Sequence, residues 1–262
     1  MIEPYYQDDA CKIYHGDCLE VMQSIPDGSI DAIITDPPYG ITACDWDSVI
    51  PFDAMWTQLK RVIKPNGAIV LFGSEPFSSA LRMSNIEMYK YDWKYKKGIA
   101  SNFVSAKFQP MKHIEDIIVF SGNGERVNYY PIMQPRTQSG KSRIEAGYKY
   151  NSKTKAAFLG DISRNYTESR YNSFLKFPED IQEFNNRSKG SRGSHPTQKP
   201  VALMSYLIKT YTNEGETILD FTMGSGTTLR AAKDLGRKAI GIEIEEKYCE
   251  IAVERLRQEV LL

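Results

Sequence analysis

A short apolar run, Ile30–Thr35, constrains the fold of this 262-residue chain more than any other stretch. It is β-branched and nearly all apolar, as expected of a strand that is buried on both faces of a parallel sheet. Two prolines, Pro37 and Pro38, then force the chain out of the strand. The sequence therefore predicts that a carboxylate, Asp36, and an aromatic ring, Tyr39, stand at the carboxyl end of a strand, where open α/β sheets bind ligands.

The tetrapeptide after this strand suits transfer of a group to an aromatic amine, which is a poor nucleophile because its lone pair is delocalised into the ring. The Asp36 carboxylate can accept one amine hydrogen and the Pro37 carbonyl another, so that the nitrogen moves toward sp³ geometry as it attacks. Tyr39 offers a ring face for stacking, and a nucleobase presents its amine in this way only after it has left the duplex. The alternative interpretation is a rigid proline-rich turn at a strand end.

Strand and helix patterns alternate around this stretch. Residues 12–17 predict a strand that leads into a helix, and Asp17 with Glu20 fits a capping box at the start of that helix. Further strands are predicted at residues 68–72, 91–95 and 114–120, and further helices at residues 52–63, ended by residues 64–67, and from about residue 74. This β-α-β series predicts an α/β fold with a doubly wound, mostly parallel, Rossmann-like sheet.

Length and composition place the chain among ordinary globular proteins. Hydrophobic residues make up 41% and charged residues 25% of the sequence, and the length suits one α/β domain with an insertion. No apolar stretch approaches the roughly 20 residues of a membrane span, and the first residues lack signal-peptide character, so we expect a soluble cytoplasmic protein. The four cysteines have no CxxC spacing and do not combine with the three histidines as in metal sites, which predicts reduced thiols and no metal.

The charge of the chain is zero overall but unevenly distributed. Residues 122–194 contain 13 Lys and Arg against 7 Asp and Glu, and they lack any hydrophobic period. Basic side chains mixed with aromatic ones suit phosphate neutralisation and base stacking, which predicts a nucleic-acid-binding insertion. The alternative is a solvated, partly disordered insertion. The candidate DNA-binding residues are Arg126, Arg136, Lys141, Arg143, Lys149, Lys153 and Lys155.

After the insertion the sequence follows the order of a nucleotide-binding βαβ unit. A predicted strand at residues 217–221 leads into the glycine loop at residues 224–228 and a helix, and the next strand ends at Glu243. The loop lacks the third glycine of the dinucleotide fingerprint and any Gly-Lys-Ser/Thr phosphate cradle, which disfavours NAD and ATP. S-adenosylmethionine fits, with Glu243 at the ribose and the loop backbone at the amino-acid end.

Three motifs in one order carry a resemblance to a known family. They are Asp-Pro-Pro-Tyr at residues 36–39, His-Pro-Thr-Gln-Lys-Pro at residues 195–200 and Asp-Phe-Thr-Met-Gly-Ser-Gly-Thr-Thr at residues 220–228. Together they closely resemble the β class of DNA amino-methyltransferases, in which the catalytic motif precedes the cofactor motif and a target-recognition region lies between them. The resemblance covers nearly the whole chain. It implies a catalytic half at residues 1–121, a target-recognition insertion at residues 122–194 and a cofactor-binding half at residues 195–262.

The resemblance also implies roles for single residues. Asp36 and Pro37 would bind the target amine and Tyr39 would stack on the flipped base, so the predicted catalytic residues are Asp36, Pro37, Pro38 and Tyr39. For the cofactor, Asp17 would approach the adenine and Glu243 would bind the ribose. Thr197 and Lys199 would hold the methionine carboxylate, and the methionine pocket would be lined by Gly224, Gly226 and Thr227. The other predicted cofactor-binding residues are Cys18, Asp36, Asp220 and Phe221.

Two further points follow from the same comparison. Residues 112–115 resemble the segment that packs beside the flipped base in the family. Phe221 departs from the family's pattern, because many relatives have proline at this position, which puts the role of Phe221 in doubt but leaves that of the glycines unchanged.

The expected function is site-specific transfer of the methyl group of S-adenosylmethionine to the exocyclic N6 of a flipped-out adenine in double-stranded DNA. The chain has no Pro-Cys dipeptide, which disfavours cytosine-C5 chemistry, and Asp36 favours adenine because cytosine-N4 relatives more often have serine there. The alternatives are a cytosine-N4 enzyme, a non-enzymatic nucleic-acid-binding protein with a vestigial cofactor fold, and methylation of RNA or a small amine. The resemblance further implies a bacterial or phage restriction-modification context, with a homodimer and a cognate restriction nuclease as possible partners.

Overall fold

The computed structural model describes residues 2–41, 47–139, 141, 175–185 and 198–258. The chain forms two compact units. The large unit comprises Met1–Tyr130 and Asp180–Leu262, and the small unit comprises Pro131–Glu179. In the small unit, β7 (Gln134–Pro135) and β8 (Leu175–Lys176) pair antiparallel.

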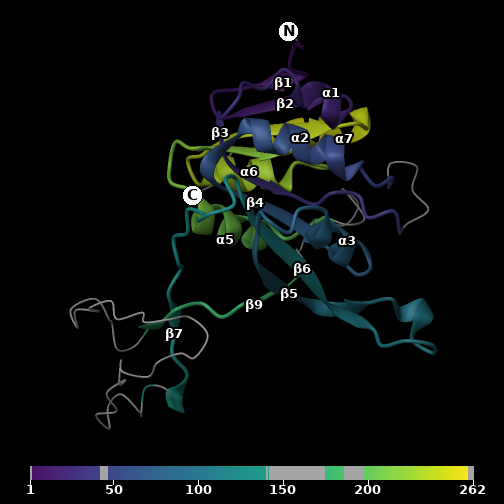
Figure 1. Ribbon diagram of the computed structural model, residues 1–262, viewed down its shortest axis with the longest axis vertical. Helices are drawn as coiled ribbons and strands as arrows, with labels where there is room; N and C mark the ends of the chain where they lie inside the picture. The colour runs from purple at the N-terminus through teal and green to yellow at the C-terminus, as the bar shows by residue number, and fades with distance from the viewer. Residues whose placement is uncertain (1, 42–46, 140, 142–174, 186–197, 259–262) are drawn as a thin grey trace. The chain divides into compact units, whose positions relative to one another are not determined.

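The large unit is built on a nine-stranded sheet with the strand order β1-β2-β11-β10-β3-β4-β6-β5-β9 (Figure 1). The strands are β1 (Tyr6–Gln7), β2 (Cys11–His15), β3 (Ile30–Thr35), β4 (Ile63–Gly73), β5 (Tyr89–Ser101), β6 (Lys112–Ser121), β9 (Ile181–Phe184), β10 (Thr217–Asp220) and β11 (Lys238–Glu243). The central strands from β2 to β4 are all parallel, whereas β6 runs antiparallel to both of its neighbours. The predicted α/β fold with a mostly parallel sheet is confirmed.

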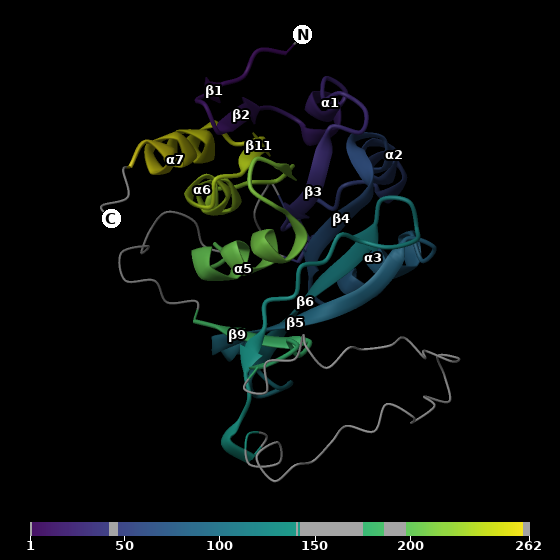
Figure 2. The same cartoon turned by 90° about the vertical axis from the view of Figure 1, so that its left-hand side faces the viewer.

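Helices cover both faces of this sheet (Figure 2). One face carries α1 (Cys18–Met22), α2 (Phe52–Val62) and α3 (Phe77–Ser84), and the other carries α5 (Val201–Tyr211), α6 (Thr227–Asp234) and α7 (Glu246–Arg257). Because side chains alternate along a strand, Ile33 and Leu71 pack under α1 to α3 while Ile34 and Val70 pack under α5 to α7. No described helix is long and apolar enough to cross a membrane.

The position of the site follows from the crossovers. Strand β3 continues through α2 into β4 on one face of the sheet, and β10 continues through α6 into β11 on the opposite face. Because β3 and β10 are parallel neighbours, the winding direction changes between them. Ligands bind at such a switch point, outside the carboxyl ends of the strands.

The end of α2 differs from the prediction. Helix α2 ends at Val62 and β4 begins at Ile63, so the predicted stop at residues 64–67 lies inside the first part of β4. The pairing with β3 shifts there, because Ile30 pairs with Ile63 but Ala32 pairs with Ala68. The turn residues therefore form an irregular part of the strand instead of a separate loop.

Both ends of the predicted insertion, residues 122–130 and 180–185, belong to the large unit. In the first part of the insertion, the Tyr130 amide donates to the Thr210 carbonyl at 2.8 Å. Near its end, β9 adds in parallel to β5, with Lys94 opposite Ile181. The sequence of β9 has no strong strand pattern of its own. This short edge strand is stabilised instead by its pairing with β5.

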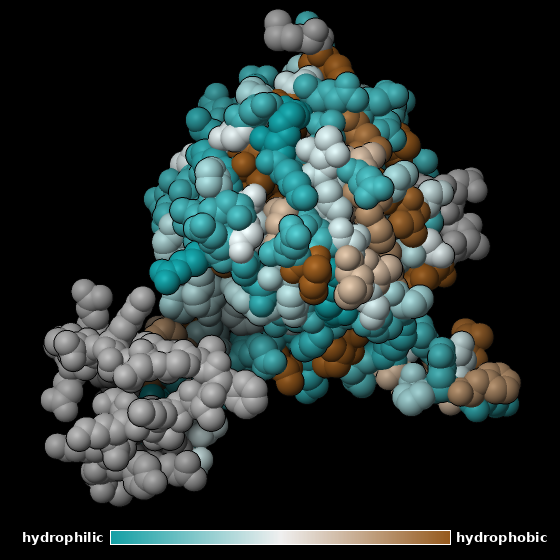
Figure 3. Space-filling view, viewed as in Figure 1, coloured by the Kyte–Doolittle hydropathy of each residue, from teal (hydrophilic) through white to brown (hydrophobic). Residues whose placement is uncertain are grey.

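Strands β5 and β6 form a long antiparallel hairpin, which in Figure 1 extends past α3. A short 3₁₀ turn, η1 (Phe103–Ser105), lies between the two strands. Figure 3 shows hydrophobic side chains on the surface at the end of this hairpin, and the exposed residues there include Phe103, Val104 and Phe108.

Candidate functional site

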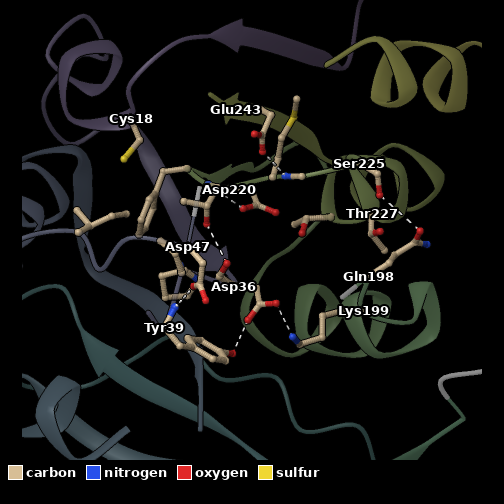
Figure 4. Close-up of a pocket in the computed structure, with 18 of the residues that line it drawn as sticks. Cys18, Asp36, Tyr39, Asp47, Gln198, Lys199, Asp220, Ser225, Thr227 and Glu243 are labelled. Carbon is tan, nitrogen blue, oxygen red and sulfur yellow. Dashed lines mark hydrogen bonds and ion pairs between the residues drawn. The ribbon is translucent and has the colours of Figure 1, made fainter. Parts of the chain in front are cut away.

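A cavity of about 750 Å³ opens at the carboxyl ends of β3 and β10 (Figure 4). Residues 36–39 after β3 form part of its wall, together with Asp220 and the glycine loop after β10 and Glu243 at the end of β11. The hairpin contributes Tyr95 and Glu115. Small-molecule sites typically have volumes of roughly 300–1,000 Å³, so this cavity is large enough for a nucleoside-sized ligand.

The Asp36 carboxylate is held by two donors on opposite oxygens. Tyr39 Oη donates to Asp36 Oδ1 at 2.5 Å, and Lys199 Nζ donates to Asp36 Oδ2. The backbone is fixed as well, because Thr222 Oγ1 donates to the Asp36 carbonyl oxygen at 3.1 Å. The predicted carboxylate and ring therefore lie together, and a lysine from a distant part of the chain joins them.

Lys199 is a buried cation shared between two carboxylates. Its Nζ lies 3.4 Å from Glu115 Oε2 and 4.9 Å from the centroid of the Phe72 ring, in addition to its bond to Asp36. Burial disfavours the ammonium charge, but the Asp36 and Glu115 carboxylates outweigh burial and raise the pKa of Lys199 to about 12. Lys199 is therefore charged at neutral pH.

Glu115 completes this charged cluster from β6. Lys97 Nζ donates to Glu115 Oε1 at 3.1 Å. Burial favours the protonated carboxyl, but the neighbouring Lys199 and Lys97 cations outweigh burial and lower the pKa of Glu115. Glu115 thus stays ionised beside the Asp36 carboxylate, and the predicted position of residues 112–115 next to the base site stays a prediction.

Tyr39 is fixed through its ring and its hydroxyl. The ring stacks on Phe77, with centroids 5.0 Å apart and planes inclined by 30°. Burial and the charge of Asp36 raise the pKa of Tyr39 well above its ordinary value, so the phenol remains a neutral donor. The stacking of this ring on a flipped base stays a prediction. The sequence pattern predicted an inward-facing Phe77 but did not indicate its contact with Tyr39.

Asp47 holds the chain that follows the tetrapeptide. Its carboxylate accepts hydrogen bonds from the amides of Tyr39 at 2.8 Å, Gly40 at 2.9 Å and Ile41 at 2.9 Å. The side chain is 8% exposed. Sequence spacing did not reveal this residue, because residues 40–51 have no hydrophobic period and an isolated aspartate in a loop has many possible roles.

Glu243 and the glycine loop form the opposite side of the cavity. The Gly224 amide donates to Glu243 Oε2 at 2.9 Å, and the Glu245 amide donates to Glu243 Oε1 at 2.8 Å. Burial raises the pKa of Glu243, and the backbone hydrogen bonds oppose this change. Each carboxylate oxygen has a second lone pair, so Glu243 can still accept hydrogen bonds from ribose hydroxyls.

Gly226 has a structural role. Its φ is +74°, and a Cβ atom at this position would lie 2.7 Å from Ala252 Cβ in α7. Gly224 and Thr227 line the cavity, whereas Gly226 is not among the lining residues. The absence of a side chain at residue 226 therefore permits the close approach of α7 to the loop.

An arginine from α7 connects the loop to the segment that carries Lys199. Arg255 Nη1 donates to Thr227 Oγ1 at 3.0 Å and to Ser225 Oγ at 3.3 Å, and Arg255 Nη2 donates to Gln198 Oε1 at 3.0 Å. In the sequence Arg255 resembles any basic residue near a helix end, and only the tertiary contacts reveal its role. Gln198 and Lys199 are adjacent, so Arg255 helps to position Lys199.

Asp220 connects the two halves of the site. Its Oδ1 accepts a hydrogen bond from Thr35 Oγ1 at 2.6 Å and one from the Thr222 amide at 3.3 Å. Burial raises the pKa of Asp220 to about 6, and the hydrogen bonds from Thr228, Thr35 and Thr222 limit the rise. The adjacent Phe221 side chain is buried in the core that contains α1 to α3.

Asp17 caps α1, as the sequence predicted. Asp17 Oδ1 accepts hydrogen bonds from the amides of Leu19 at 2.7 Å and Glu20 at 3.2 Å. The residue also lines the cavity, as does Cys18, whose thiol pKa is raised to about 12 by burial and then by Asp17. Cys18 is thus a neutral thiol. Within the described ranges, no three His, Cys, Asp or Glu side chains form a group that could hold a metal ion.

The cavity brings together most of the predicted site residues. They are Asp17, Cys18, Asp36, Pro37, Pro38, Tyr39, Lys199, Asp220, Phe221, Gly224, Thr227 and Glu243. Thr197 lies outside the described residues. Among the DNA-binding candidates, Arg126 belongs to the large unit, Arg136 and Lys141 belong to the small unit, and Arg143, Lys149, Lys153 and Lys155 lie outside the described residues.

Solved structures of DNA methyltransferases share this fold. The cytosine-N4-specific PvuII DNA methyltransferase aligns with a TM-score of 0.68 and 16% identity, over 99% of this chain and 91% of that chain. The complex of M1.HpyAVI with S-adenosylmethionine aligns with a TM-score of 0.61 and 25% identity, over 95% of this chain and 100% of that chain.

Sequence relatives and a family model agree with this likeness. The type II methyltransferase M2.LlaDCHI of Lactococcus lactis subsp. cremoris is 28% identical over 284 residues, which cover 98% of this chain and 93% of the relative. The type II methyltransferase M.BamHI of Bacillus amyloliquefaciens is 27% identical over 272 residues and 98% of this chain, which spans 59% of the length of that relative. The model of the DNA methylase family, N6_N4_Mtase, matches residues 30–254. Because this match includes both the Asp36 motif and the glycine loop, the chain belongs to the N6/N4 DNA methylase family.

Proposed function

We propose that this protein is a site-specific DNA methyltransferase that transfers the methyl group of S-adenosylmethionine to the N6 amine of an adenine flipped out of double-stranded DNA. One observation carries the proposal. The Asp36 carboxylate, held by Tyr39 and Lys199, lines the same cavity as Glu243 and the glycine loop. A group that can bind an amine and a group that can bind a ribose thus share one cavity.

The residues of the cavity fit this cofactor. S-adenosylmethionine supplies an electrophilic methyl group on a positively charged sulfur. Glu243 offers acceptor oxygens for the ribose hydroxyls, and Gly224, whose φ is +51°, has no side chain that would keep a ligand away from the loop backbone. Membership of the N6/N4 DNA methylase family and the bound cofactor of M1.HpyAVI support the assignment.

Asp36 acts on the amine. Each of its oxygens already accepts one hydrogen bond and has a further lone pair, so an amine N–H can bind without displacing Tyr39. In direct transfer the bond between the methyl carbon and the cofactor sulfur would break as the nitrogen–carbon bond forms, with the electron pair left on the sulfur. Positive charge would then develop on the nitrogen, and the nearby Asp36 carboxylate would stabilise this charge and accept the proton that leaves. The Pro37 carbonyl is proposed as the second acceptor.

Lys199 orients Asp36 through its bond to one carboxylate oxygen. The family resemblance assigned Lys199 to the methionine carboxylate, whereas the contacts here join it to Asp36 and Glu115. Glu115 provides a second counter-charge, so the lysine is not left unpaired in a buried site when Asp36 turns to the amine. We therefore assign to Lys199 the role of positioning Asp36. This role is compatible with binding of the methionine carboxylate by the same ammonium group.

The choice of adenine rests on Asp36, because the resemblance associates this residue with N6 enzymes. Cytosine-N4 is the second candidate, because the PvuII enzyme that shares the fold is specific for it. The two are separated by incubating the protein with DNA and cofactor carrying a labelled methyl group, digesting the DNA to nucleosides and identifying the product by mass spectrometry. N6-methyladenine supports the proposal, and N4-methylcytosine replaces it with the second candidate.

The role of Asp36 is tested by single-turnover methyl transfer. Asp36→Ala and Asp36→Asn should slow transfer by about 10²-fold or more, because a transition-state contact is lost, with cofactor affinity largely unchanged by calorimetry. Asp53→Asn, an exposed carboxylate in the first turn of α2, is the matched control. An Asp36 variant that keeps more than about a tenth of the wild-type rate contradicts the assigned role.

The other hypotheses have their own measurements. Cofactor binding without transfer to any nucleic acid would favour the non-enzymatic alternative, and faster transfer to RNA than to duplex DNA in a direct competition would change the substrate. The homodimer and the cognate nuclease stay predictions. The contribution of Arg136 and Lys141 to DNA affinity also stays a prediction, and is tested by the salt dependence of duplex binding in the double alanine variant.

A further inference from the structure

The end of the β5–β6 hairpin exposes large apolar side chains that the fold does not use. We define the hairpin tip as residues 102–111. Within it, Phe103 is 81% exposed, Val104 is 93% exposed and Phe108 is 90% exposed. The chain is compact here, because the Phe108 amide donates to the Ser105 carbonyl at 2.9 Å. Isolated apolar residues on a surface are common, but three such residues within one short turn indicate an interaction surface.

The charge around the hairpin tip indicates which chemical class of partner can bind there. Residues 96–114 contain no Asp or Glu, although the whole chain has equal numbers of acidic and basic residues. The basic residues of this segment are Lys96, Lys97, Lys107, Lys112 and His113, of which Lys96 and Lys97 form ion pairs with Glu183 and Glu115. Lys107 lies within the tip and is exposed. A partner that accepts both features combines negative charge with apolar surface, as the phosphates and stacked bases of DNA do.

The base of the hairpin forms part of the wall of the catalytic cavity. Ser101, Lys112 and Ile114 line the cavity that also contains Asp36, as does Asn102 at the start of the tip. The tip continues from this wall, and Figure 3 shows hydrophobic side chains at the surface at the end of the hairpin. A duplex that delivers one of its bases into the cavity therefore passes beside the tip.

We propose that the hairpin tip inserts into the DNA duplex beside the flipped nucleotide, with Phe103, Val104 and Phe108 entering the base stack and Lys107 contacting a phosphate. The inference rests on the proposed function, because a base must leave the duplex to reach Asp36. Apolar side chains that enter between base steps replace part of the stacking that is lost when a base flips out.

A second copy of this chain is a poorer partner for the tip. In a two-fold dimer built on this surface the same patch lies on both sides of the interface. Lys107 would then face a segment that has no acidic residue to pair with it. DNA provides the missing negative charge.

The test compares two duplexes that contain the methylated site identified in DNA from cells expressing the protein. In one duplex the target base is paired. In the other it lies opposite an abasic position, so it has no pairing partner and flips out more easily. The triple variant Phe103→Ala, Val104→Ala, Phe108→Ala should slow single-turnover transfer on the paired duplex by about tenfold or more and on the abasic duplex by much less. Met83→Ala, which truncates an exposed apolar residue on α3, is the control and should change neither rate.

Two further variants keep the proposal testable if the triple variant folds poorly. Val104→Asp alone places a negative charge at a highly exposed position and should reduce affinity for the paired duplex. Lys107→Ala should reduce the slope of log affinity against log salt by about one, as expected for one phosphate contact. Cofactor affinity, measured by calorimetry, should stay the same in every variant.

The outcomes separate this proposal from the proposed function. If the wild-type protein transfers no methyl group to DNA, the proposed function fails and this inference fails with it. If the wild-type protein is active and the variants match it on the paired duplex, the tip does not insert and the proposed function is unaffected. Equal slowing on both duplexes, with loss of a dimer in sedimentation, would assign the tip to a second copy of the chain instead.

Discussion

The loop after residues 36–39 should depend on a single buried carboxylate. Asp47 accepts three backbone amide hydrogen bonds, from Tyr39, Gly40 and Ile41, at 2.8 to 2.9 Å. Asp47→Ala removes all three acceptors. Asp47→Asn retains one side-chain carbonyl oxygen, which can still accept from Tyr39 and Gly40, so the bond to Ile41 is the one that is lost.

The expected magnitudes follow from these contacts. The loss of a hydrogen bond to a charged group costs about 1.5–3 kcal/mol when the donor is left buried and unsatisfied. Gly40 and Ile41 are exposed, so their amides can bind water after the substitution, and each bond should count for about 1 kcal/mol. We expect a loss of about 3 kcal/mol in the free energy of unfolding for Asp47→Ala and about 1 kcal/mol for Asp47→Asn.

Urea denaturation and single-turnover transfer measure the two consequences. Asp53→Asn should unfold like the wild-type protein, because this exposed residue supports no loop. Transfer by Asp47→Ala should fall by about 10²-fold, because a shift of about 1 Å in Tyr39 and Asp36 moves the reacting groups out of alignment. If Asp47→Ala unfolds within about 0.5 kcal/mol of the wild-type protein, the three hydrogen bonds do not stabilise the loop and the reasoning fails.

Three further predictions concern the cofactor side of the cavity. Glu243→Gln should weaken cofactor binding by about tenfold in calorimetry while the single-turnover rate at saturating cofactor changes little, since a ribose contact is similar in ground and transition states; unchanged affinity would count against the contact. Gly226→Ala should lower the free energy of unfolding in urea by about 3 kcal/mol or more, because the φ of Gly226 is +74° and the new Cβ would lie 2.7 Å from Ala252 Cβ. Gly215→Ala is the control, because Gly215 has a φ of +79° but open space around it, and it should lose only the conformational part of about 1–2 kcal/mol. Equal losses in the two variants would exclude a steric effect at residue 226. Asp220 has a pKa raised to about 6 from 3.8, so the wild-type protein should lose up to about 3 kcal/mol of stability from this group as the pH rises from about 4 through 6. Asp220→Asn does not titrate, so its stability relative to wild type should increase over this pH range, and a pH-independent difference would refute the burial argument.

The elements that sequence predicts well are those whose pattern is local. The β3 strand is recognisable because its residues are β-branched and nearly all apolar, and because prolines mark its end. In the structure all six of its residues are buried. Helix α2 is recognisable because Met55, Trp56 and Leu59 recur on one face. The glycine loop and Glu243 follow from their spacing in a βαβ unit, and the cavity brings them together with Asp36.

The parts of the site that sequence does not predict depend on long-range contacts. Lys199 reaches Asp36 across 163 residues of chain, and Arg255 reaches Gln198 across 57 residues. Charged side chains at such separations have no period that could reveal their pairing. Gly226 was predicted to line the methionine pocket, but its missing side chain faces α7, which no local pattern indicates. The choice between adenine and cytosine has the same origin, because it depends on the shape of the base site.

The order of the two halves along the chain has no effect on how the site is built. Strand β3 comes early in the chain and β10 comes late, but they are parallel neighbours, so their carboxyl ends coincide at one edge of the sheet. Thr35 Oγ1 donates to Asp220 Oδ1 at 2.6 Å, so the last residue of β3 binds the last residue of β10, and Thr222 Oγ1 donates to the Asp36 carbonyl at 3.1 Å, so the loop after β10 binds the residue that follows β3. A displacement of the cofactor loop therefore also moves Asp36. Because both substrates must be aligned to within a fraction of an ångström for direct transfer, this reciprocal bonding between strand ends makes the relative position of amine and cofactor a property of the sheet itself.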